Sequence, residues 1–221
     1  MLLCHAQPST DKPFFAQSAV YVYGGRVSRS PDGTKSVRVV QLNDENLTST
    51  ATVSFADREL HKQVLYGLNV QVLWSPDSKA FALTGSDTGA NGEYRTDVFA
   101  LDGTQLNQIS LTKLVQREFG HPVVCEVPEL PNVVAIKWLQ PSIRLLVAAQ
   151  IVPHTVCDSG GTFKAYDVDV QNRRIVRVFG QLETKKLFGP SLGEWLLAAR
   201  DECVTNPKSC EVPFHHQVPP K

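Results

Sequence analysis

The segment VLWSPDSKAFAL, residues 72–83, decides the fold, because it predicts a strand, a tight turn and a second strand. Proline has its φ already fixed near the value that the first central position of a turn needs, and the aspartate after it can hydrogen-bond its own backbone. An earlier copy of the turn is Ser30-Pro31-Asp32-Gly33, so that Pro76 follows Pro31 by 45 positions. In both copies an apolar strand, a polar loop and a further strand follow the turn. The chain therefore contains a repeat whose length predicts a four-stranded unit.

A third copy is degenerate. Val133–Trp138 matches the strand before the turn, and Gln140-Pro141-Ser142 stands where the second copy has Ser-Pro-Asp. The prolines of these two turns are 65 positions apart, which corresponds to one repeat and an insertion of about 20 residues. The insertion spans residues 111–132, and we expect a short helix in it at Leu111–Phe119.

Residues 72–83, with the strand and hairpin at 94–103, resemble the repeat of the propeller from the bacterial Tol translocation system and, more widely, WD-type repeats. The resemblance covers residues 26–110 well and 132–180 weakly. It implies an all-β, β-propeller-like array of about three four-stranded antiparallel blades that serves as a binding platform; some propellers of this kind are regulatory halves of peptidases. Propellers typically have at least four blades. Three copies therefore leave three alternatives: a hidden fourth blade, an open arc, or a ring that two chains close together as a homodimer.

The chain is expected to have three regions. Residues 1–13 are a disordered N-terminus or a signal-peptide remnant, residues 14–180 are the propeller-like domain, and residues 181–221 hold a C-terminal helix, a disulfide loop and a tail. The helix is predicted at Ser191–Glu202, because Ser191 and Glu194 have the spacing of a capping box.

Composition excludes several classes of partner. The 22 basic and 22 acidic residues balance, and no charged block is present that would hold a polyanion, so nucleic acid is not expected as a partner. No run approaches the roughly 18 apolar residues of a membrane span. Hydrophobic residues make up 42% of the chain, which is enough for a buried core. No cofactor is expected.

Cysteine usage favours an oxidising compartment. Cys125, Cys157, Cys203 and Cys210 are an even set with three pairings, among which sequence alone cannot choose. The segment between Cys203 and Cys210 looks like a small loop closed by its own bridge, which leaves Cys125 with Cys157. Two disulfides, with a start that resembles the end of a secretory signal, predict a secreted or periplasmic protein. Four reduced thiols in a cytosolic protein are the alternative.

The repeat also predicts where a binding surface lies. In a blade, the loop entering the first strand and the loop after the second lie at the same end. Loops on a rigid scaffold commonly carry binding residues. The insertion at 111–132 then shares one acidic, loop-rich face with the other loops of this kind, whose carboxylates are Asp44, Glu45, Asp87, Glu93 and Asp158. Cys125 and Cys157 fall in two such loops of the third repeat, so that their pairing is sterically sensible.

Two patterns give weaker candidates. Gly189-Pro190-Ser191-Leu192-Gly193 matches the G-x-S-x-G turn of serine hydrolases, which needs a strand before the turn and a helix after it. No long apolar strand enters this turn, and Ser191 as a helix cap explains the same letters. Asp87, Asn91 and Glu93 offer oxygen ligands for calcium, but a hairpin connection explains them as well. No catalytic or metal-binding residue is therefore predicted.

The sequence thus favours a secreted or periplasmic propeller-like protein that acts as a protein-interaction module, with another protein as its partner and no catalytic activity of its own. One alternative is a serine hydrolase, or a hydrolase accessory domain, that uses Ser191. A second alternative is an extracellular inhibitor or lectin-like binder whose disulfides hold the recognition loops.

Overall fold

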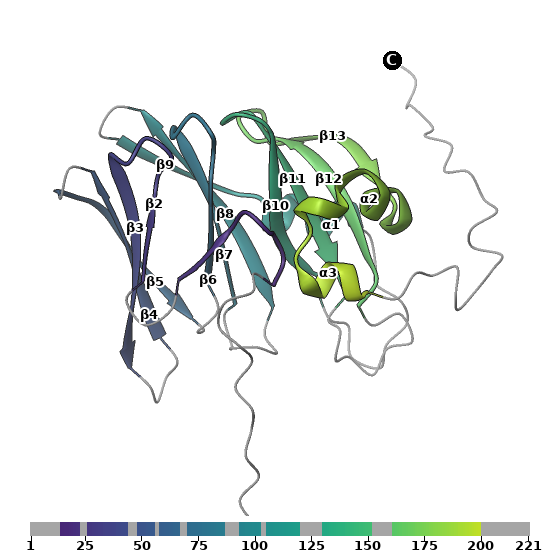
Figure 1. Ribbon diagram of the computed structural model, residues 1–221, viewed down its shortest axis with the longest axis horizontal. Helices are drawn as coiled ribbons and strands as arrows, with labels where there is room; N and C mark the ends of the chain where they lie inside the picture. Colours follow the sequence, from purple (N-terminus) through teal and green to yellow (C-terminus); the bar gives the residue numbers. More distant parts are fainter. Residues whose placement is uncertain are drawn as a thin grey trace, which may run out of the picture.

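The computed structural model describes residues 14–22, 26–43, 48–55, 58–66, 70–86, 93–102, 105–119, 130–151 and 161–199. These residues form three antiparallel sheets that lie side by side, and none of the three closes on itself (Figure 1). The prediction of about three four-stranded antiparallel units is confirmed at this level. Within the described residues the array is open.

Each sheet follows the repeat along the chain, with strands paired in sequence order. Sheet 1 contains β2 (Val27–Arg29), β3 (Lys35–Asn43), β4 (Thr48–Phe55) and β5 (Arg58–Tyr66). Sheet 2 contains β6 (Val70–Trp74), β7 (Ala80–Ser86), β8 (Tyr94–Asp102) and β9 (Gln105–Ser110). Sheet 3 contains β10 (Asn132–Gln140), β11 (Arg144–Gln150), β12 (Phe163–Asp169) and β13 (Arg174–Phe179).

A fifth strand joins sheet 2 from an earlier part of the chain. β1 (Val20–Val22) pairs antiparallel with β6, and Tyr21 lies opposite Gln71. The β-branched and aromatic residues Val20-Tyr21-Val22 favour a strand at this place, but they do not specify its partner. β1 covers the edge of β6 that the four-stranded repeat leaves open.

Alternating side chains fill the spaces between the sheets, as the two-residue period of a strand requires. Sheets 1 and 2 meet over an apolar cluster that includes Val37, Val53 and the stacked rings of Phe81 and Phe99, 5.0 Å apart. Sheets 2 and 3 meet over a second cluster that includes Val98 and Val147. Fully burying one such side chain stabilises a fold by roughly 1.5–3 kcal/mol, so these two clusters hold the sheets together.

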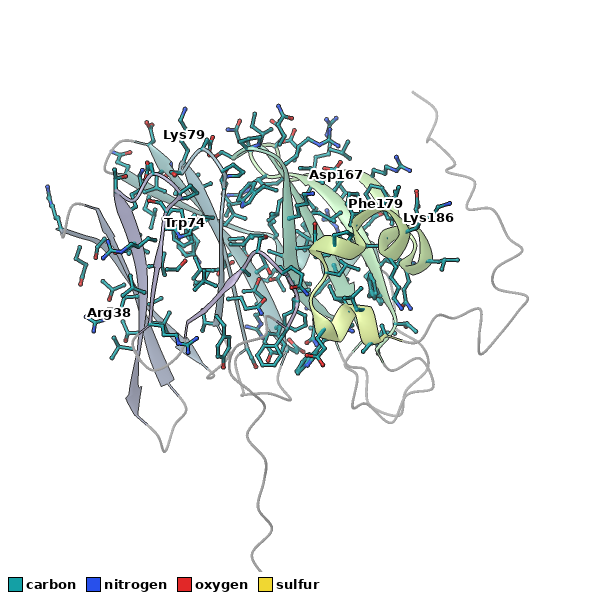
Figure 2. All side chains as sticks on the ribbon, viewed as in Figure 1. Arg38, Trp74, Lys79, Asp167, Phe179 and Lys186 are labelled. Carbon is teal, nitrogen blue, oxygen red and sulfur yellow. The ribbon has the colours of Figure 1, made fainter. Side chains whose placement is uncertain are left out.

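The two outer faces of the array differ. Sheet 1 turns Arg29, Arg38 and Val40 outward to solvent, and Figure 2 shows Arg38 on that side, away from Trp74. The outward face of sheet 3 is covered by helices α2 (Gln181–Phe188) and α3 (Glu194–Ala198), which pack on it through a third apolar cluster. One outer face thus exposes both charged and apolar side chains to solvent, and the other is covered by the chain's own helices.

The helices correct one prediction and confirm another. α1 (Thr112–Phe119) lies where the sequence predicts the helix of the insertion. The predicted helix at 191–202 is wrong at both ends, because Gly193 is the N-cap of α3, no side chain caps it, and the helix stops at Ala198. α2 and the 3₁₀ turn η2 (Gly189–Ser191) were not predicted. No helix in the described part of the chain is long and apolar enough to cross a membrane.

Tertiary contacts explain why the capping box is not formed. The Gly193 N–H donates to the Phe15 carbonyl at 2.7 Å, and the Trp195 N–H donates to the Phe14 carbonyl at 3.0 Å. The segment ahead of β1 therefore satisfies the amides that a capping side chain would otherwise satisfy. Rings add to this contact, since Phe14 and Trp195 lie 5.0 Å apart. We call the pairing of residues 14–17 with residues 191–195 the clasp.

Candidate binding face

The two ends of the sheets carry different kinds of connection. At one end are the turns within each repeat, at residues 30–34, 75–79 and 140–143; in Figure 1 this is the upper end. The antiparallel register places Val70 opposite Gly85, and Asn132 opposite Gln150, at the other end. Strands β3, β7 and β11 end there, and the strands that follow them, β4, β8 and β12, begin there. The strand ends that border the connections at 44–47, 87–92 and 152–160 therefore lie at the same end as the start of β10, which follows the connection at 120–129. We call this the loop-bearing end.

Two of the three upper turns contain the same hydrogen bond. The Ser30 hydroxyl donates to Asp32 Oδ1 at 2.6 Å, and the Ser75 hydroxyl donates to Asp77 Oδ1 at 2.6 Å. The bond from Ser30, with further bonds from Thr34, lowers the pKa of Asp32 well below its usual value. Both carboxylates are therefore held ionised at neutral pH, and each fixes the shape of its own turn.

Serines also join each turn to the next one. The Asp32 N–H donates to Ser78 Oγ at 3.0 Å, and the Ser142 hydroxyl donates to Asp77 Oδ1 at 2.6 Å. Counted from the preceding tryptophan, Ser142 occupies the place of Ser78, and both have left-handed backbones, with φ of 53° and 59°. Serine at this corner thus reaches the aspartate-bearing turn of the preceding repeat. The three turns are linked in series.

The tryptophans make a second set of links between sheets. Trp74 Nε1 donates to Ser28 Oγ of sheet 1 at 3.1 Å, and Trp138 Nε1 donates to the Leu73 carbonyl of sheet 2 at 3.1 Å. Each indole fills the space between two sheets and bonds back to the preceding one. The tryptophan of the repeat is therefore a structural residue.

Threonine hydroxyls satisfy the inner edge of β10. Thr96 Oγ1 donates to the Val133 carbonyl at 2.8 Å, and the Ala135 N–H donates to Thr84 Oγ1 at 3.2 Å. The two hydroxyls are also 2.9 Å from each other. Backbone groups that would be costly to bury unpaired are paired in this way. Sheet 3 is fixed to sheet 2 by polar as well as apolar contacts.

Buried amides fix the strand ends that border the loops. Asn132 Oδ1 accepts the Tyr94 N–H at 2.9 Å, and Gln150 Nε2 donates to the Gly161 carbonyl at 3.0 Å. Gln71, which is 3% exposed, finds no hydrogen-bond partner for either atom of its amide among the residues that the structure describes. No motif in the sequence predicts a role for these three amides. The signal available was a single amide residue within or at the end of an apolar strand, as in VQVLW at 70–74.

Of the acidic residues predicted on the face, the structure describes Glu93. It precedes β8, is partly exposed, and its carboxylate lies 3.3 Å from the guanidinium of Arg95. Outside the described residues lie Asp44, Glu45, Asp87, Asn91 and Asp158, as do Cys125, Cys157, Cys203 and Cys210. Among the residues that the structure does describe, no group of three His, Cys, Asp or Glu side chains could hold a metal ion.

Ser191 does not sit in a nucleophile elbow. The element before it is helix α2, which runs into η2, whereas the elbow needs a strand there. Its carbonyl accepts the Gln17 N–H at 3.0 Å, and the next residue, Leu192, forms a bridge with Ala16. In the described residues Ser191 is therefore part of the clasp.

Comparison with known proteins gives little more. No protein-family model matches the chain, and no curated protein matches it in sequence. Among solved structures, the acylaminoacyl peptidase of Pyrococcus horikoshii is 14% identical with a TM-score of 0.39, over 73% of this chain and 25% of that one. An acylaminoacyl peptidase in complex with Z-Gly-Gly-Phe-chloromethyl ketone is 13% identical with a TM-score of 0.38, over 77% and 25%. The chain thus spans about a quarter of these proteins, and likenesses this weak support no conclusion about activity.

Proposed function

We propose that this chain is a propeller-like protein-interaction module of a secreted or periplasmic protein, which binds another protein through the loop-bearing end of its sheets. The observation that supports this most is the set of hydrogen bonds at the opposite end, by which serine and aspartate side chains link three successive turns. Sheets fixed to one another in this way can hold the strand ends that border the loops in constant relative positions, and loops on such a scaffold commonly carry binding residues.

The scaffold also supports the proposal through the way the sheets are joined. The indoles of Trp74 and Trp138 and the hydroxyls of Thr84 and Thr96 fix neighbouring sheets to each other by hydrogen bonds. The relative positions of strand ends in different sheets are therefore fixed. A partner that contacts several of these strand ends at once would meet groups whose relative positions are already fixed.

Cross-linking to proteins of the secreted or periplasmic fraction, with recovery by mass spectrometry, tests the proposal. We expect a saturable complex that Glu93→Gln, combined with Asp87→Asn, weakens at least about tenfold by removing two charges from the loop-bearing end. Asp102→Asn, which removes a charge from the turn end, is the matched control and should leave the complex unchanged. A purified chain that forms no saturable complex contradicts the proposal.

The same preparation tests the hydrolase alternative. If Ser191 is a structural residue of the clasp, Ser191→Ala changes no esterase or peptidase activity of the purified chain. A hydrolysis rate that the substitution abolishes, with the unfolding free energy unchanged, would favour the enzyme.

A further inference from the structure

The last strand of each four-stranded repeat lies at the edge of its sheet, and the three edges are not alike. β5, β9 and β13 hold equivalent places in sheets 1, 2 and 3, each paired on one side only. An unpaired edge offers backbone donors and acceptors to any extended chain, and natural proteins block such edges with charges and bulges. A comparison of the three edges therefore shows where pairing is prevented and where it is not.

Two of the edges carry both kinds of protection. β5 exposes Arg58 and Glu59, and its pairing with β4 shifts register opposite Val53 and Ser54. β13 exposes Arg174 and Arg177, and its pairing with β12 likewise shifts register. A register shift bends the strand and disturbs the spacing of its outward groups. These two edges are poor templates for another strand.

β9 has neither protection. Its six residues, Gln105–Ser110, include no charged residue and no proline. Its register with β8 runs unbroken from Asp102 opposite Gln105 to Asp97 opposite Ser110. Nothing in the described part of the chain pairs with its outer edge.

The register shows which backbone groups are available. The Leu111 N–H donates to the Thr96 carbonyl at 3.1 Å, and the alternation of an antiparallel ladder then turns the backbone groups of Asn107 and Ile109 toward β8. The N–H and C=O groups of Leu106, Gln108 and Ser110 therefore point away from sheet 2. They form a regular row of donors and acceptors at the spacing of a strand.

We propose that the outer edge of β9 binds an extended segment of a partner protein as an added strand. The segment is uncharged at its centre and carries an apolar residue on the side of Leu106, which is half-buried against the cluster between sheets 1 and 2. A second folded copy of this chain fits less well. A pair of six-residue strands buries far less than the about 1,600 Å² of a standard interface between folded proteins, whereas strand addition by a peptide uses this length.

A library of random 12-residue peptides displayed on phage provides the probe. We expect binders in which β-branched residues alternate with polar ones. Gln108→Pro removes an outward N–H without touching the ladder to β8, and should weaken a selected synthetic peptide at least about tenfold, which is what one hydrogen bond and the blocked approach are worth. Gln108→Ala is the matched control. It loses the side-chain bond to Asp97 but keeps the N–H, and should change affinity less than about threefold.

N-methylation of the peptide keeps the test independent of whether the proline variant folds. Strand addition uses the amides of alternate peptide residues, so methylation at one parity should abolish binding and methylation at the other should not. Since the inference rests on the proposed binding function, the outcomes must separate the two. Binders that tolerate Gln108→Pro and methylation at both parities would overturn the β9 site and leave a binding module. A library that yields no binder would contradict the β9 site alone, because the binding module is tested separately by the saturable cross-linked complex. Self-association of the chain that is lost in Gln108→Pro would replace the peptide by a second copy.

Discussion

Asp77 shows how one residue can connect two repeats. Burial opposes its ionisation, but hydrogen bonds from Ser142, Ser75 and the Lys79 N–H outweigh burial, so that the pKa of the carboxyl is lowered from 3.8. A carboxylate with a lowered pKa in the folded state stabilises the fold above its unfolded pKa. That contribution is lost as the pH falls from about 4 through the folded-state pKa.

Asp77→Asn should therefore reduce the difference between the free energies of unfolding at neutral and at acid pH. The wild type is expected to be more stable than the variant near about pH 6, and this advantage should shrink toward about pH 3 as Asp77 becomes protonated. Urea unfolding at several pH values measures both. Asp102→Asn, at the exposed end of β8, is the control for general charge effects. An advantage that stays constant between these pH values would show that the turn does not depend on the ionised carboxyl.

The clasp belongs to the scale of elements, because it joins the segment before β1 to the start of α3. Gly193 is needed at the closest approach, where a Cβ would lie 2.4 Å from the Phe14 carbonyl carbon and oxygen. No rearrangement of a side chain can relieve a contact with backbone atoms.

Gly193→Ala should destabilise the protein by about 2 kcal/mol or more, because the clasp must shift to admit the methyl group. The free energy of unfolding in urea measures this loss. Gly189→Ala is the control, since nothing lies within 4 Å of a Cβ at that position, and it should change stability by less than about 0.5 kcal/mol. Equal losses of unfolding free energy in the two variants would mean that the clasp accommodates the methyl group without loss of stability.

Some of the strands and helices can be predicted from local sequence patterns, and others cannot. The SPDG and WSPDS turns predict the strands around them, because proline, aspartate and a left-handed corner determine local geometry. Trp138 and Pro141 predict the third repeat. Local patterns did not predict α2, the start of α3 or the partner of β1, because tertiary pairing with Phe14, Phe15 and β6 decides these. For the same reason, the sequence marks the buried amides at the loop-bearing end as single polar residues in apolar strands but does not specify the groups that they bond.

At the scale of the whole molecule, the state of the cysteines tests the proposed secreted or periplasmic location. Cys125, Cys157, Cys203 and Cys210 lie outside the described residues, so their state is a matter for measurement. We expect the non-reduced chain to show no free thiol besides Cys4, because two bridges fit a secreted or periplasmic protein. Thiol counting under denaturing conditions, before and after reduction, tests this. Four free thiols in addition to Cys4 would contradict the proposed location.

The clasp has a consequence for how the chain folds. Phe14 and Trp195 are about 180 positions apart in the sequence, yet their rings are in contact. Contacts of such long range require the closure of a very large loop, and the entropy of that closure must be offset by structure formed in between. The repeats can assemble from local hairpins, whereas the segment ahead of β1 can form the clasp only after residues 191–195 are in place. We therefore expect the clasp to form late in folding.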